Sequence, residues 1–257
     1  MLELRNICKV YNPGTVQEIC LFENFNLSVP EGQFVSVVGS NGSGKTSMLN
    51  ILCGSIPADS GSILLGGKDI VRESEHRRAR RMGRVYQNPA MGTCGSMTIL
   101  ENMALADNKG KPYNLRPGTD RRRVEAYKEL LRPLGLGLEN MLSSKVGSLS
   151  GGQRQALSLI MSSMTPIEFL ILDEHTAALD PKTAEIIMEM TNRIVREKKL
   201  TALMVTHNLR YALEYGDRLL MMHQGGIVLD KAGEEKQNVR MDDILKIFNE
   251  ISIECGN

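Results

Sequence analysis

The sequence predicts an α/β fold with a core of buried parallel strands, an antiparallel β subdomain near the N-terminus and an inserted helical subdomain. Three apolar runs, Phe34–Val38, Phe169–Leu172 and Ala202–Val205, lack polar alternation, which is typical of parallel strands covered on both faces. A glycine-rich segment follows the first run and leads into a helical pattern. The long stretch between the first and second runs is mainly helical in pattern and is interrupted by prolines, which indicates an insertion.

These observations divide a single domain, residues 1–257, into a core and its additions. We expect residues 1–87 and 166–230 to form the α/β core with its β subdomain, and residues 88–165 to form the helical subdomain. Residues 231–257 are left as a C-terminal tail.

The first part of the core begins with short strands. The pattern predicts them at Leu2–Ile7, Ile19–Phe22, Phe25–Val29 and Ser62–Leu65. A helix is expected to start near Lys45, directly after the glycine-rich segment, and Gly54 is placed to end it as a C-terminal cap.

The second part of the core carries a further helix and a hairpin. Asp180 and Pro181 combine an N-cap residue with proline at the first helical position, so a helix is expected there. Leu219–Met222 and Ile227–Leu229 flank a glycine turn and predict a hairpin. The tail includes an amphipathic pattern at Met241–Ile251, which predicts a last helix.

The composition is that of an ordinary globular protein, with 42% apolar and 24% charged residues and a formal net charge of +1. This balance provides no field that favours nucleic acid, so we expect no nucleic-acid partner. The sequence has no apolar run near the roughly 18 residues that span a bilayer, and charges stand where a signal peptide has its apolar stretch. We therefore expect a cytoplasmic protein that reaches a membrane through a partner. The five cysteines lack CxxC spacing and are expected to be free thiols.

The strongest motif is the glycine-rich segment itself, which satisfies the phosphate-loop pattern GxxxxGK[ST] between a buried strand and a helix. Backbone N–H groups of such a loop bind phosphate oxygens, and the helix N-terminus adds a partial positive charge. Lys45 would reach the β- and γ-phosphates of ATP, and the Thr46 hydroxyl would bind Mg²⁺. The expected nucleotide-binding residues are Gly39, Ser40, Asn41, Gly42, Ser43, Gly44, Lys45 and Thr46. The segment thus resembles the phosphate loop of P-loop NTPases, and this resemblance implies a RecA-like core.

A second motif supplies acidic groups. The apolar strand Phe169–Leu172 is followed directly by Asp173 and Glu174. A phosphate loop needs a carboxylate from a neighbouring strand end, and these two residues supply it. Asp173 is suited to hold Mg²⁺ through water, and Glu174 could polarise the attacking water. Without the phosphate loop, two solvated loop acids would explain the pair equally well.

The deciding motif is LSGGQ at Leu149–Gln153, between the other two. Ser150 can cap a helix, while Gly151 and Gly152 remove side chains so that another molecule's phosphate could approach its positive end. Gln153 completes the motif. With these motifs in order, residues 2–229 resemble the ATP-binding cassette (ABC) family, whose signature is LSGGQ.

The resemblance implies roles for further residues. Tyr11 matches the aromatic residue on which adenine stacks, although a tyrosine at a strand end also serves packing. Gln87 matches the glutamine that reaches Mg²⁺ or the water and connects the core to the helical subdomain. Asp180 matches a loop that crosses the dimer interface, which is compatible with its N-cap role. His207 matches the histidine that contacts the γ-phosphate and joins Glu174, Gln87 and Lys45 as a catalytic residue.

The resemblance also implies an assembly. The family pairs the phosphate loop of one subunit with the signature of another, so a head-to-tail homodimer with two ATP molecules is expected. The dimer would energise solute uptake through separate integral-membrane permease subunits, stimulated indirectly by an extracytoplasmic solute-binding protein, and would lie on the inner face of the cell membrane. An exporter ATPase and a soluble ABC switch or assembly scaffold are the alternatives. One position departs from the family pattern, since His175 stands where proline is common, but both acids remain and hydrolysis is expected.

Overall fold

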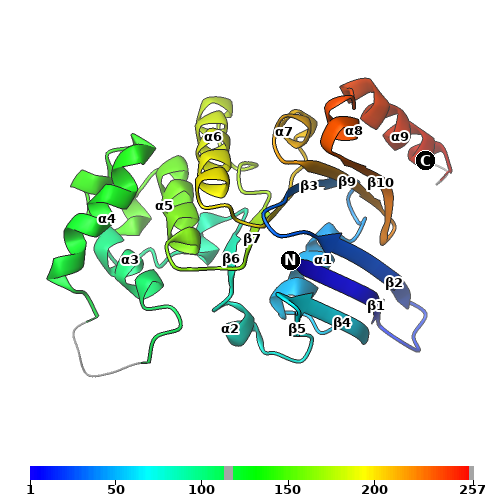
Figure 1. The fold of residues 1–257 in the computed structure, drawn as a ribbon, viewed down its shortest axis with the longest axis horizontal. Helices are drawn as coiled ribbons and strands as arrows, with labels where there is room; N and C mark the ends of the chain where they lie inside the picture. The colour runs from blue at the N-terminus through cyan, green and yellow to red at the C-terminus, as the bar shows by residue number, and fades with distance from the viewer. Residues whose placement is uncertain (113–117, 255–257) are drawn as a thin grey trace.

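The computed structural model describes residues 1–112 and 118–254. Residues 113–117 of the expected helical subdomain, and the end of the expected tail with Cys255, lie outside the described residues. The strands in the described part form two sheets, and helices pack around them (Figure 1). The predicted architecture, an α/β core with an antiparallel sheet and an inserted helical region, is confirmed.

The larger sheet holds the buried strands. Its order is β10-β9-β3-β8-β7-β6, and all neighbouring pairs are parallel except the β9–β10 hairpin. The bounds are Phe34–Gly39 (β3), Met82–Val85 (β6), Phe169–Asp173 (β7), Ala202–Val205 (β8), Arg218–His223 (β9) and Gly226–Ala232 (β10). The three predicted buried strands and the hairpin are confirmed. The strand β6 was not predicted, because Gly83 and Arg84 break its apolar pattern.

The smaller sheet is antiparallel, with the order β2-β1-β4-β5. Its strands are Leu2–Tyr11 (β1), Ile19–Val29 (β2), Ser60–Leu65 (β4) and Lys68–Asp69 (β5). The two strands predicted at Ile19–Phe22 and Phe25–Val29 are one strand, so their separation was wrong. The register shifts within β2, where Asn24 takes a positive φ of 53°, and this irregularity explains the broken pattern.

The helices follow the predicted caps. Gly54 ends α1 in a left-handed conformation, and its N–H donates to the carbonyl oxygens of Asn50 and Ile51. Asp180 caps α6 by accepting from the N–H of Thr183. The bounds are Lys45–Cys53 (α1), Glu75–Arg78 (α2), Ile99–Asp107 (α3), Val124–Leu131 (α4), Gly151–Ser163 (α5), Pro181–Glu197 (α6), Leu209–Glu214 (α7), Gly233–Gln237 (α8) and Met241–Glu254 (α9).

Two apolar clusters lie on opposite faces of the larger sheet, because successive strand residues point to opposite sides. On β7, Leu170 and Leu172 join the cluster formed with α3 to α6, whereas Phe169 and Ile171 join the cluster formed with α1 and the smaller sheet. The helix α1 is therefore buried between the two sheets, and Figure 1 shows it there. This packing fixes the start of α1 relative to the strand ends.

Across the described residues, no helix has the length and apolar character needed to cross a bilayer. The described cysteines, Cys8, Cys20, Cys53 and Cys94, are free thiols.

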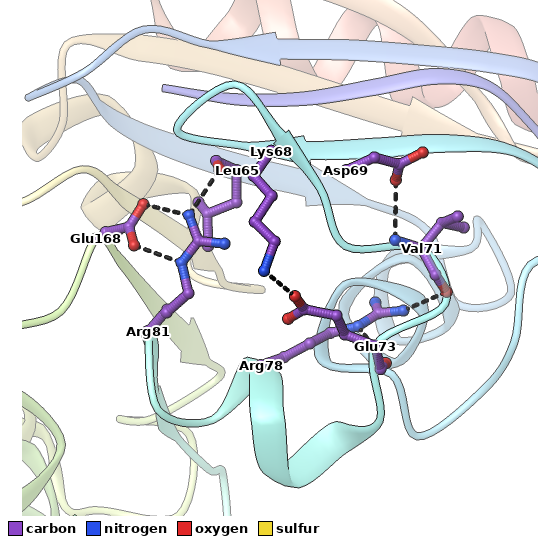
Figure 2. Close-up of polar contacts among 8 residues, drawn as sticks. All are labelled: Leu65, Lys68, Asp69, Val71, Glu73, Arg78, Arg81 and Glu168. Atoms are coloured by element: carbon purple, nitrogen blue, oxygen red, sulfur yellow. Dashed lines mark hydrogen bonds and ion pairs between the residues drawn. The ribbon is translucent and has the colours of Figure 1, made fainter. Parts of the chain in front are cut away.

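The segment that leads from β5 to β6 is held by two arginines (Figure 2). The Arg78 guanidinium, 3% exposed, donates to the carbonyl oxygens of Ile51 and Leu52 at the end of α1 and to those of Val71 and Glu73. A cation at this position also complements the negative end of the helix. Arg81 donates to both carboxylate oxygens of Glu168, just before β7, and to the Leu65 carbonyl. The two side chains tie α1, the smaller sheet and β7 together.

Replacing Arg78 with methionine should lower the free energy of unfolding by about 2–4 kcal/mol, because four carbonyl groups, two buried and two part-buried, lose a charged donor. Urea denaturation measures this change. The matched control is Arg77→Met on the same helix, where the side chain is exposed and the expected change is within about 0.5 kcal/mol. Equal effects of the two substitutions would contradict the structural role of Arg78.

Candidate functional site

A pocket of about 220 Å³ lies at the junction of β3 and α1. The glycine-rich loop forms one wall, and side chains from other elements complete it. The lining residues are Leu21, Asn41, Gly42, Ser43, Gly44, Lys45, Thr46, Ser47, Glu174 and His207. The phosphate-loop residues expected from Asn41 to Thr46 thus share one pocket with two of the expected catalytic residues.

The loop must be glycine-rich where the backbone approaches its neighbours. A Cβ atom on Gly39 would lie 2.2 Å from the carbonyl oxygen of Met222 on β9. The Gly225 N–H in the β9–β10 turn donates to the Ser43 carbonyl oxygen at 3.1 Å. The loop therefore rests on the hairpin.

Lys45 closes the loop around its own ammonium group. Its Nζ donates to the carbonyl oxygens of Gly39 and Ser40, both at 2.8 Å, and to the Ser43 hydroxyl at 3.3 Å. Burial lowers the pKa of Lys45, while the Glu174 carboxylate acts in the opposite direction. A charged donor in this loop suits a phosphate ligand, because the negative charge of the phosphate would offset the cost of burying the Lys45 ammonium group.

Thr46 is exposed in the pocket, one residue along α1 from Lys45. Ser47 follows, and its hydroxyl oxygen lies 3.2 Å from the Tyr11 hydroxyl. Tyr11 itself ends β1 and is half-buried beside the pocket. The structure thus places Tyr11, the expected adenine-stacking residue, next to α1, the helix that follows the phosphate loop.

Glu174 and His207 meet at the pocket although they are 33 positions apart in the sequence. The Nε2 atom of His207 lies 2.7 Å from Oε1 of Glu174, so the imidazole donates to the carboxylate. Glu174 takes a positive φ of 46°, and its N–H donates to the Val205 carbonyl oxygen at the end of β8. This backbone bond aims the carboxylate at the pocket. The Glu174 side chain is 14% exposed, whereas that of His207 is 45% exposed and can turn.

Asp173 and Gln87 lie outside the group of residues that line the pocket. Asp173 ends β7, where its Oδ2 accepts from Arg84 at 2.7 Å. Gln87 is exposed and follows β6. Sequence reasoning missed Arg84, because a single arginine in a short strand carries no motif.

The signature residues lie at the start of α5, away from the described lining of the pocket. Ser150 and Gln153 form a capping box, in which each side chain accepts from the backbone N–H of the other. Gly152 is buried against α6, and a Cβ there would lie 2.3 Å from a Thr183 methyl group. Ser150 and Gly151 remain exposed.

The fold and this pocket define a P-loop nucleoside triphosphatase. The chain belongs to the ABC transporter family, whose model matches residues 22–177. It is an ATP-binding ATPase subunit of that family.

The relatives of the chain agree with this class. It is 48% identical over 248 residues to a tyrosine transport ATP-binding protein of Clostridioides difficile, covering 96% of this chain and 98% of that protein. It is 32% identical over 259 residues to a spermidine/putrescine import ATP-binding protein of Pasteurella multocida, covering 98% of this chain and 64% of that protein. Among solved structures, a dimeric ATP-binding cassette in a post-hydrolysis state with ADP and Pi is 28% identical with a TM-score of 0.76. The match covers 90% of this chain and 98% of the chain in that structure.

His175, the departure from the family pattern, points away from the pocket. It is 2% exposed, and its Nε2 lies 3.0 Å from the Thr191 hydroxyl on α6. Burial lowers the pKa of His175 to about 4. The imidazole is therefore neutral at neutral pH and serves packing between the strand end and α6.

His175→Gln should weaken the pH dependence of stability. The unfolded chain protonates this histidine near pH 6.5 and the folded protein only near pH 4, so the free energy of unfolding falls as the pH drops through this window. Between pH 7 and pH 5, the decrease should be smaller by about 2 kcal/mol in the variant.

Urea denaturation at both pH values measures this difference. The control is His76→Gln, which changes an exposed histidine and should leave the dependence unchanged. A wild-type pH dependence in His175→Gln would contradict the burial argument.

Proposed function

We propose that this ATPase drives import of a small organic solute through separate integral-membrane permease subunits, with which it lies at the inner face of the cell membrane. One observation carries the mechanism. The phosphate loop, Glu174 and His207 share a pocket, whereas the exposed start of α5 lies away from it. Each chain then contributes two separate halves of a nucleotide site, namely the pocket and the exposed start of α5. The name of the tyrosine transport relative supports a small organic solute.

The half-sites become complete in a head-to-tail homodimer. ATP lies between Gly39–Thr46 of one copy and Ser150–Gln153 of the other, where Asp180 lines the same interface. Tyr11 stacks on the adenine. The dimeric cassette with ADP and Pi supports this arrangement. Because the triphosphate is fully bound only when both copies meet, ATP favours the closed dimer.

Magnesium fits the residues available. Mg²⁺ takes oxygen ligands and usually accepts one or two from the protein beside the phosphates. The exposed Thr46 hydroxyl lies in the pocket, and Asp173 and Gln87 supply a carboxylate and an amide oxygen from neighbouring strand ends. When bound with ATP, Mg²⁺ would neutralise charge on the β- and γ-phosphate oxygens.

The chain's own residues perform the proton transfer. Lys45 leaves the loop carbonyls and binds β- and γ-phosphate oxygens. Glu174 accepts a proton from a water molecule, whose oxygen forms a bond to the γ-phosphorus as the bond to the ADP oxygen breaks. His207 can turn its N–H from Glu174 to the γ-phosphate, which frees the carboxylate for the water. The helical region then passes the motion to the permease through the Gln87 segment.

Glu174→Gln should bind ATP but hydrolyse it roughly 10²- to 10⁴-fold more slowly, because the amide cannot accept the proton. The variant should accumulate as a dimer in ATP, measured by size-exclusion chromatography with light scattering. The control Lys45→Ala loses the charged donor, so it should bind ATP weakly and stay monomeric. Normal turnover by Glu174→Gln would reject the assigned base.

The direction of transport is tested with the permease. The reconstituted complex should hydrolyse ATP faster when a solute-loaded binding protein is added on the extracytoplasmic side. The same protein without solute is the control. Stimulation only by solute on the ATPase side would indicate export, and copurification with a soluble scaffold instead of a permease would indicate the assembly role.

A further inference from the structure

Arg84 on β6 bridges the strand that ends in Asp173 and the helix that bears Thr46. It pairs in register with Ile171, two residues before Asp173 on the neighbouring strand β7. Its Nη2 donates to Oδ2 of Asp173 at 2.7 Å, and its Nη1 donates to Oδ1 of Asn50 at 3.0 Å. Asn50 and Thr46 are four residues apart on α1 and hence share a helix face.

The surroundings hold the guanidinium in this place. The Arg84 and Asp173 side chains are only 12% and 14% exposed. The guanidinium carbon lies 4.6 Å from the centre of the Tyr86 ring, which covers one face of the group. The Nε of Arg84 is buried without a hydrogen-bond partner, although the two terminal nitrogens are bonded. The contacts to Asp173 and Asn50 therefore outweigh the cost of an unsatisfied donor at this position.

The positive charge of Arg84 beside the Asp173 carboxylate matters for cation binding. A divalent cation near Asp173 would be attracted by the carboxylate and repelled by Arg84, and both effects are strengthened by partial burial. With Arg84 in place, the carboxylate is neutralised before any cation arrives. A divalent cation without nucleotide then gains little binding free energy at Asp173. Its affinity for the site must come from the phosphates of ATP.

We propose that Arg84 is a positioning residue that neutralises Asp173 in the nucleotide-free protein and makes binding of the divalent cation depend on ATP. This inference rests on the proposed function, because it takes Asp173 to be the carboxylate on the cation side of the site. Through its second bond, to Asn50, Arg84 would also connect Asp173 to the helix face that bears Thr46.

The test uses Mn²⁺ alone as the probe, with nucleotide-free protein. The loss of the free Mn²⁺ signal in electron paramagnetic resonance reports binding without any activity. Arg84→Met removes the charge and should lower the dissociation constant for Mn²⁺ at least about tenfold relative to the wild type. Arg84→Lys keeps a positive charge and should show no such gain. Adding Asp173→Asn to Arg84→Met should abolish the gain.

Thermal unfolding confirms that each variant is folded, and Arg84→Gln, which can still reach Asn50, replaces Arg84→Met if that variant fails to fold. Unchanged Mn²⁺ affinity in a folded, charge-free variant would overturn the inference, as would an equal gain in Arg84→Lys. The proposed function is checked separately, by weaker Mn²⁺ binding to the ATP complex of Asp173→Asn. If that check fails, the assignment of Asp173 falls, whereas a failure of the Arg84 variants alone leaves it intact.

Discussion

The site depends on the ammonium group of Lys45 inside the phosphate loop. Its bonds to the carbonyl oxygens of Gly39 and Ser40 require the backbone to curl around one side chain. The curl is possible only where the loop can approach the Met222 carbonyl without a side chain. The carbonyl oxygens of Gly39 and Ser40 thus accept from Lys45 where phosphate oxygens would be stronger, charged acceptors.

The strand order then brings the chemistry to this loop. The strands β3, β8 and β7 are parallel neighbours, so their carboxyl ends meet at one edge of the sheet. The phosphate loop follows β3, His207 follows β8, and Glu174 follows β7. Glu174 and His207, which are remote in sequence, therefore contact each other because each follows a strand that ends at this edge. The Glu174 N–H to Val205 bond fixes the last step, because it ties the end of β7 to β8.

Sequence patterns predicted the strands and helix ends that are determined by residues within the element itself. The buried strands were evident from unbroken apolar runs, and the ends of α1 and α6 from Gly54 and Asp180. The strand β6 was missed because Gly83 and Arg84 break its apolar pattern, and only its pairing with β7 places it in the core sheet. The same limit applies to the site. Motifs identified its residues individually, but the Arg84–Asp173 bond joins positions 89 residues apart, and no local pattern encodes such a pairing.

The signature motif shows why two neighbouring glycines differ in role. Gly152 packs against Thr183, where a Cβ would clash with the methyl group, so α5 and α6 could not keep their present spacing with a side chain there. Gly151 has its nearest such neighbour, a Leu179 methyl group, at an ordinary 3.5 Å and is exposed. Packing within the chain therefore explains Gly152 but leaves Gly151 unexplained. A bare backbone at the positive, exposed end of a capped helix is suited to an anion from outside the chain, and in the dimer that we propose this anion is the ATP held by the second copy.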